Sequence, residues 1–222
     1  MKITTLASGS SGNSYLLDDG EQILVIECGV PLMEVKRAIK FQVIRLAGAI
    51  VSHEHGDHAG YVMQYQKMGL AVFRPYRTIT DDFQKIKMGH YEVTSFPLVH
   101  DVPCFGFLIE TKDKRILYSS DTAYIKYRFK DIDCMIVEAN YDKSLLIAAD
   151  DDSPKRSHVL HGHMDIDTTC RFIKANDNER LKAVILAHMS EVNGDKDLFI
   201  RKAQNVTDAK IAVADKGLEI II

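Results

Sequence analysis

The chain has 222 residues, of which 46% are hydrophobic and 27% are charged, and its formal net charge at pH 7 is −3. A chain of this length can build one sizeable core, so we expect a single domain over residues 1–222. No apolar run approaches the roughly 20 residues that would span a membrane. The net charge also argues against a protein that grips nucleic acid through bulk positive charge alone.

The expected elements form a strand-rich chain with helices interspersed. Apolar runs bounded by turn residues predict strands at residues 3–7, 14–17, 22–28, 47–52, 71–74, 91–98, 104–110, 116–120, 134–137, 183–187, 211–214 and 218–222. Apolar side chains at helical spacing predict helices at residues 31–39, 58–68, 166–173 and 199–206. Residues 76–88 are ambiguous, with a weak helical bias.

Two loops have alternative interpretations. The loop at residues 8–13 is rich in serine and glycine. It forms either a tight hairpin or a surface whose backbone amides and Asn13 side chain line a cleft. A mixed charge run at residues 148–156 is either a solvated excursion or a flap over that cleft.

The cysteines lie far apart and fit neither a paired zinc motif nor an obvious disulfide framework. They are Cys28, Cys104, Cys134 and Cys170. We expect them to be buried thiols in a reducing cytoplasm. Residues 1–7 lack the long apolar region of a secretion signal, and no protein partner is evident.

The most informative stretch lies at residues 49–60, where an apolar strand runs into His53, His55, Asp57 and His58. Imidazole and carboxylate ligands in this combination suit Zn, Mn or Fe ions. In extended backbone His53 and His55 point the same way and can converge on one ion, while Asp57 and His58 lie beyond them as the chain turns into a helix. Two ions are therefore expected.

Further ligand candidates directly follow other predicted strands. They are His100, Asp121, Glu138 and His188. A site on the rim of a sheet has this arrangement, because the strands fix the rim while the loops supply the chemistry. Two divalent ions would bring four positive charges, of which Asp57 and Asp121 would cancel two. The cleft would then suit a phosphodiester.

Together these motifs resemble the metallo-β-lactamase fold superfamily over essentially the whole chain. The resemblance implies an α/β protein, a four-layer αββα sandwich with a dinuclear metal site at one edge. It implies that His53, His55 and His100 hold the first ion, that Asp57, His58 and His188 hold the second, and that Asp121 bridges the two.

Departures from particular branches of the superfamily narrow the range of expected substrates. Asp121 stands where the true β-lactamases have a cysteine, and His55 stands where the flavodiiron oxygen reductases have a glutamate. Only 42 positions separate Asp121 from His163, too few for the large insert of the RNase J type. There is also no long arm of the RNase Z type.

The nuclease branches nonetheless look closest. Residues 137–141, 162–164 and 187–191 look like the carboxylate and histidine motifs of RNase Z and RNase J. Residues 6–15 are similar to the start of the compact YycJ (WalJ) group of exonucleases. The resemblance thus implies a metal-dependent phosphodiesterase or nuclease, with exonuclease activity favoured and DNA or RNA as the substrate.

The implied mechanism uses two divalent ions, Zn or Mn, to generate a bridging hydroxide that attacks phosphorus. Asp57 would orient the water and accept its proton. His163 would protonate the departing oxygen, and Glu138 would hold the other ring nitrogen of His163. His161 lies two residues away and competes with His163 for this role.

Two other functions stay open from the sequence. The same hydroxide would also hydrolyse a lactone, a thioester or a cyclic phosphodiester, since a fold does not determine a substrate. A non-catalytic metal-bound sensor is the third alternative, although a binding module has no need of an open dinuclear site.

Overall fold

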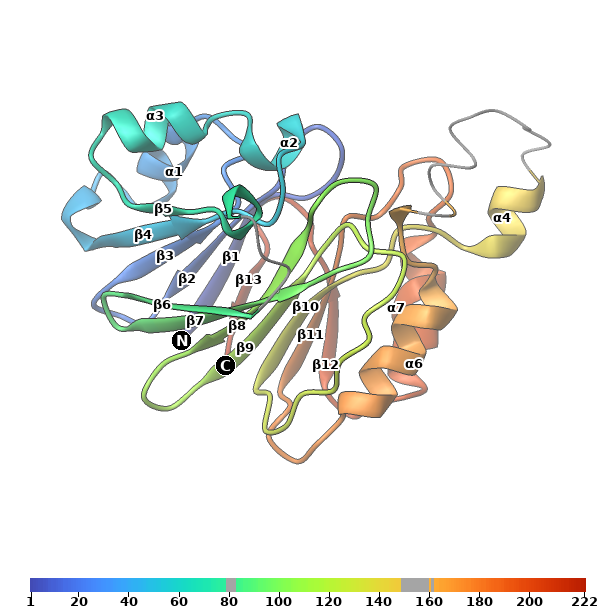
Figure 1. The fold of residues 1–222 in the computed structure, drawn as a ribbon. Coiled ribbons are helices and arrows are strands. Elements are labelled where there is room, and N and C mark those ends of the chain that lie inside the picture. Colours follow the sequence, from blue (N-terminus) through green and yellow to red (C-terminus); the bar gives the residue numbers. More distant parts are fainter. Residues whose placement is uncertain (79–82, 149–159, 161) are drawn as a thin grey trace.

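The computed structural model describes residues 1–78, 83–148, 160 and 162–222, and its two β-sheets face each other (Figure 1). The first sheet has the strand order β13-β1-β2-β3-β4-β5, and the second has the order β12-β11-β10-β9-β8-β7-β6. The strands are β1 (Lys2–Ala7), β2 (Ser14–Asp18), β3 (Ile23–Ile26), β4 (Leu46–Ile50), β5 (Val72–Phe73), β6 (Gln84–Met88), β7 (Tyr91–Pro97), β8 (Phe105–Glu110), β9 (Arg115–Ser119), β10 (Cys134–Glu138), β11 (Ala183–Ala187), β12 (Lys210–Val213) and β13 (Glu219–Ile221).

Helices cover the outer faces of both sheets (Figure 1). They are α1 (Leu32–Ala38), α2 (Gly56–Ala59), α3 (Val62–Lys67), α4 (Lys143–Ala148), α6 (Ile166–Asn176) and α7 (Lys196–Gln204), with 3₁₀ turns at Val43–Arg45 and Pro75–Arg77. Within the described ranges, every helix is too short or too polar to cross a membrane.

Three apolar clusters hold four layers together. The central cluster joins the inner faces of the two sheets and includes Tyr15 from β2 and Phe107 from β8. A second cluster packs β2, β3 and β4 against α1 and α3 through residues such as Val35. A third packs β9, β10 and β11 against α6 and α7, with Ile173 and Phe199 fully buried. The αββα sandwich expected from the sequence is therefore confirmed.

Parallel strands bring the chemistry to one edge of the sandwich. Strands β3, β4 and β5 run parallel in the first sheet, and β9, β10, β11 and β12 run parallel in the second. The carboxyl ends of parallel strands meet at the same edge of a sheet. His53, Asp121, Glu138 and His188 all lie at or just beyond such ends.

The structure differs from the sequence-based expectation at residues 84–88, which form strand β6 and not part of a helix. The side chains of this segment alternate between half-buried and exposed before Met88, and every residue pairs with β7 in an antiparallel hairpin. The period of two that defines a strand is present, but only over five residues at the edge of the sheet.

Two helices also differ from expectation. The helix expected over residues 58–68 is divided into α2 and α3, because the carbonyl oxygen of Asp57 accepts a bond from the Asn13 amide at 2.7 Å and the Tyr61 amide donates to Cys28 at 3.0 Å. Helix α4 was not expected; the carboxylate of Asp142 accepts the Ser144 amide at its start, at 2.8 Å. The charge run beyond Ala148, including residues 149–156, and His161 lie outside the described residues.

Candidate metal centre

The loop after β4 carries the first group of ligand-type side chains. His53 is fully buried, and the donor atoms of His53, His55 and His100 all lie within 4.8 Å of one another. His100 comes from the loop between β7 and β8, where its Nδ1 lies 2.9 Å from the carbonyl oxygen of Gly162. Three imidazoles from two distant segments therefore converge on one point.

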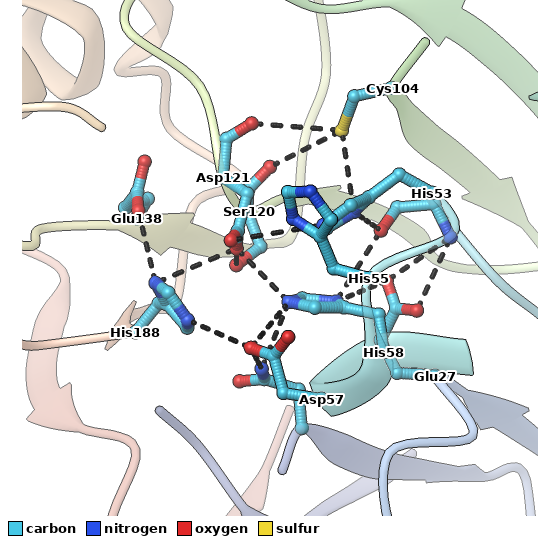
Figure 2. Close-up of polar contacts among 12 residues, drawn as sticks. Glu27, His53, His55, Asp57, His58, Cys104, Ser120, Asp121, Glu138 and His188 are labelled. Atoms are coloured by element: carbon cyan, nitrogen blue, oxygen red, sulfur yellow. Dashed lines mark hydrogen bonds and ion pairs between the residues drawn. The ribbon is translucent and has the colours of Figure 1, made fainter. Parts of the chain in front are cut away.

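A second group lies beside the first and contains Asp57, His58, Asp121 and His188. The Nε2 of His58 lies 3.2 Å from Asp121 Oδ1 and 3.4 Å from Asp57 Oδ2. The Nε2 of His188 lies 3.5 Å from Asp57 Oδ2. Figure 2 shows these side chains pointing toward one another from α2 and from the ends of β9 and β11.

Asp121 lies between the two groups. Its Oδ1 belongs to the second group, and its Oδ2 lies 3.9 Å from His53 Nε2 in the first. Ser120 donates a hydrogen bond of 2.7 Å to Oδ1. This is the position that a bridging carboxylate would occupy.

A third group shares Asp121 and His188 with the second and adds Glu138 and His163. The Nδ1 of His163 lies 2.6 Å from Glu138 Oε1, and the other oxygen of Glu138 accepts the backbone amides of Thr122 and Met164 at 2.9 and 3.1 Å. Glu138 is fully buried. It therefore holds the ring of His163 in a fixed orientation against the site.

Three residues of the site adopt left-handed backbone conformations that glycine prefers. The φ angles are 66° at Glu27, 48° at Asp121 and 53° at His188. In each case the strand has just ended, so the turn redirects the side chain into the cleft. Such conformations cost non-glycine residues free energy and concentrate at functional sites.

Carboxylates and burial set the charge of the imidazoles. Burial and the neighbouring His58 lower the pKa of His53 to about 2, so this imidazole is neutral, the form that binds a metal. Burial opposes protonation of His58 and His188 as well. There the carboxylate of Asp121 outweighs burial, with further acidic neighbours, and raises the pKa of His58 well above its usual range and that of His188 to about 10.

The acids show the complementary effect. Burial alone would raise the pKa of Asp57 and of Asp121, but the imidazoles of His188 and His58 outweigh burial and lower both. The imidazole of His163 lowers the pKa of Glu138 in the same way. The site thus places three ionised carboxylates against imidazoles that hold protons, and divalent cations could take the place of those protons.

The side chains present fit such cations. Two buried ring nitrogens, Nε2 of His53 and Nε2 of His188, have no hydrogen-bond partner among the described residues, although buried nitrogens are ordinarily paired. Each faces one of the first two groups. Imidazole and carboxylate ligands suit Zn and Mn.

All the site residues expected from the sequence lie in these three groups, so the structure brings together side chains from distant parts of the chain. Sequence reasoning missed several supporting residues. Glu27, fully buried, lies 3.4 Å from His58 Nδ1 and accepts the Ser52 amide at 3.2 Å. Ser52 Oγ lies 2.9 Å from His53 Nδ1, and Cys104 Sγ lies 3.6 Å from the same atom. A carboxylate at the end of the continuous apolar run of β3 was the available signal for Glu27.

The loop at residues 8–13 joins β1 and β2 in an antiparallel hairpin and also brings the Asn13 side chain into the cleft, so both of its alternatives describe it. The amide nitrogen of the Asn13 side chain lies 3.1 Å from Asp57 Oδ2 and 2.9 Å from His58 Nε2. The backbones of Asn13, Gly29 and Asp57 are also in direct contact, because Gly29 donates to Asn13 and Asn13 donates to Asp57. A Cβ on Gly29 would lie only 1.7 Å from the Asp57 carbonyl oxygen.

The cysteines behave as expected from the sequence. All four are buried and none forms a disulfide.

Comparison with known proteins identifies the family. Residues 61–189 match the family described as beta-lactamase superfamily domain, and residues 7–67 match the metallo-beta-lactamase superfamily. The exodeoxyribonuclease WalJ of Streptococcus pneumoniae is 26% identical, covering 99% of this chain and 91% of that protein. The exodeoxyribonuclease YycJ of Bacillus anthracis is 24% identical, covering 99% and 94%.

Solved structures show the same fold. The metallo-beta-lactamase fold protein YhfI from Bacillus subtilis superimposes with a TM-score of 0.73 at 19% identity, covering 99% of this chain and 98% of that one. The short form of human tRNase Z gives 0.66 at 17% identity, covering 100% and 99%. The chain therefore belongs to the metallo-β-lactamase superfamily of metal-dependent hydrolases.

Proposed function

We propose that this hydrolase is a nuclease that removes nucleotides from DNA as an exonuclease. The observation that carries the proposal is the His163–Glu138 pair, which lies beside the metal-ligand groups and could protonate the leaving oxygen of a phosphodiester. The ring of His163 lies 5.2 Å from that of His188 and 5.7 Å from that of His100. The near full-length likeness to two exodeoxyribonucleases supports the choice of substrate.

In this proposal the centre holds two divalent ions, Zn or Mn. His53, His55 and His100 would hold one, and Asp57, His58 and His188 would hold the other, with Asp121 shared between them. When bound, such a pair supplies an activated water near neutral pH and neutralises charge on the phosphoryl oxygens.

The chain's own groups supply orientation and proton transfer. Asp57 is ionised, so its carboxylate can orient the attacking water and accept its proton. Burial would lower the pKa of His163, but Glu138 outweighs burial and raises it. His163 is therefore suited to carry a proton at neutral pH and to donate it to the departing oxygen. Glu138 stays hydrogen-bonded to the other ring nitrogen of His163, Nδ1.

A substrate panel tests the proposal. The purified protein, loaded with Mn or Zn, is assayed on bis-p-nitrophenyl phosphate, on 5′-labelled single- and double-stranded DNA, on RNA, and on a lactone and a thioester. We expect mononucleotide release from DNA, abolished in Asp57→Ala with the fold retained. The matched control is His90→Ala, whose half-exposed imidazole pairs with Asp19 outside the centre. Cleavage of a lactone or thioester without any phosphodiester would contradict the proposal.

We also place the reaction in the cytoplasm, where the four buried thiols would stay reduced.

A further inference from the structure

A cavity of about 340 Å³ lies between helix α6 and the segment that follows Asp121. We call it the Tyr124 groove. The lining residues used below are Tyr124, Lys126, Arg128, Met164 and Arg171.

The Tyr124 groove adjoins the metal centre through two stretches of backbone. Tyr124 follows Asp121 by three positions, and Met164 directly follows His163. The chain segments that carry Asp121 and His163 therefore continue directly into the lining of the groove.

The backbone under Tyr124 is tied to the centre. The hydroxyl of Thr122 donates to the carbonyl oxygen of Val99 at 3.1 Å and accepts the Tyr124 amide at 3.3 Å, and the Ala123 amide donates to Val99 at 2.9 Å. Val99 immediately precedes His100. Tyr124 is nevertheless 57% exposed, although large aromatic residues are usually buried. An exposed ring on an anchored backbone can serve as a platform for stacking.

The charge of the groove differs from that of the chain as a whole. Its lining includes Lys126, Arg128 and Arg171 and no acidic residue, whereas the whole chain carries a formal charge of −3. Within residues 1–78, 83–148, 160 and 162–222, none of these three cations forms an ion pair. Arg128 donates to the carbonyl oxygen of Ala175 at 2.7 Å and Arg171 to the hydroxyl of Thr168 at 2.7 Å. These bonds fix the arms, and a guanidinium has five N–H donors, so others remain for a phosphate.

A second cavity beside the centre is less suited to a polyanion. It has a volume of about 460 Å³ and borders the loop at residues 8–13. Its lining includes Glu34 and Asp215, and its lysine, Lys216, lies 3.7 Å from Glu34. Charge complementarity therefore favours the Tyr124 groove.

We propose that the Tyr124 groove binds single-stranded DNA next to the scissile bond, with one base stacked on Tyr124 and backbone phosphates on Lys126 and Arg171. This inference rests on the proposed nuclease function and adds a place for the strand. It names Tyr124 as a binding residue that no metal-ligand motif indicates.

Binding without catalysis provides the test. Fluorescence anisotropy of a 5′-fluorescein oligo-dT is measured with chelator-treated wild type, Tyr124→Ala, Tyr124→Phe and Lys126→Ala. Lys112→Ala, in the exposed turn between β8 and β9, is the matched charge control. We expect Tyr124→Ala to bind about tenfold more weakly, within the range for one lost base-stacking contact. Tyr124→Phe should bind within about twofold of wild type because its ring still stacks.

Lys126→Ala should lower the slope of log K against log salt by about 0.7, the value for one phosphate contact on a single strand. Lys112→Ala should leave that slope unchanged. In the metal-loaded enzyme, Tyr124→Ala should lower kcat/KM for oligo-dT about tenfold more than kcat/KM for bis-p-nitrophenyl phosphate, which is too small to reach the groove.

Wild-type affinity in Tyr124→Ala would overturn this inference while DNA cleavage by the wild-type enzyme upheld the nuclease function. A loss confined to a matched oligo-U probe would overturn the assignment to DNA. Absence of both DNA binding and DNA cleavage in the wild-type protein would overturn the inference and the nuclease function together.

Discussion

Replacing Gly29 by alanine should disable the centre although every proposed ligand side chain is kept. The new Cβ would lie 1.7 Å from the Asp57 carbonyl oxygen and 2.5 Å from the Asn13 amide nitrogen. Both are backbone atoms that cannot rotate away. An ordinary van der Waals contact needs at least 3.4 Å, so the backbones of residues 29 and 57 would have to move apart by about 1.7 Å. This movement would displace Asp57 itself.

A misplacement of about 1 Å in a catalytic group can cost about a hundredfold in rate. We therefore expect kcat for bis-p-nitrophenyl phosphate to fall at least about a hundredfold in Gly29→Ala, with a loss of about 1–3 kcal/mol in the free energy of unfolding from overpacking. The matched control is Gly56→Ala, next to Asp57 in sequence, where a Cβ would meet nothing within 4 Å. If folded Gly29→Ala kept more than half of the wild-type kcat, contact between these loops would not be what positions Asp57.

Three further predictions concern proton transfer, metal content and acid stability. His163→Ala should retain its metal by elemental analysis and lose at least about a hundredfold in kcat, since general acid catalysis is worth about 10²- to 10⁴-fold; loss of the metal instead would make His163 a ligand. Chelation should abolish activity and lower the Tm, because ligands that bind only the folded state stabilise it; an unchanged Tm would contradict tight metal binding. Asp142→Asn should destabilise the protein at pH 7 but not at pH 2. Burial would raise the pKa of the Asp142 carboxyl, but hydrogen bonds from Ser144 and Lys202 outweigh burial and lower this pKa from 3.8 to about 2. The ionised carboxylate therefore stabilises the folded protein above pH 4, and this stabilisation is lost between about pH 4 and pH 2. The whole pKa shift corresponds to about 2.5 kcal/mol of folding free energy, which solvent screening reduces to about 1 kcal/mol. Urea unfolding at pH 7 and at pH 2 measures the free energy of unfolding of both proteins. An equal loss of stability in Asp142→Asn at both pH values would refute this linkage.

The metal-ligand candidates were readable from the sequence because they either share the loop that begins at His53 or directly follow another apolar run. His53, Asp121 and His188 follow strands whose burial is set by local patterning, and the parallel arrangement then brings their ends together. The αββα fold was likewise anticipated, through the resemblance carried by the same motifs. The local pattern was enough to identify a ligand wherever that ligand follows the end of one strand.

The supporting residues depend on long-range contacts that no local pattern encodes. Glu27 meets His58 because β3 pairs with β4. Asn13 was one of two alternatives in the sequence, and its contact with Asp57 is decided by the first loop folding over α2. Strand β6 was missed because its alternation covers only five residues at an edge. The Tyr124 groove exists because helix α6 packs beside the segment after Asp121, a proximity visible only in three dimensions.

The left-handed turns at Glu27, Asp121 and His188 have an energetic consequence. Glycine would relax each turn, by about 1 kcal/mol, yet would delete the carboxylate or imidazole placed there. Backbone strain therefore favours glycine at these three positions, whereas the buried ion pairs and the proposed chemistry require the side chains that are present, so each turn keeps a strained conformation for the sake of its carboxylate or imidazole.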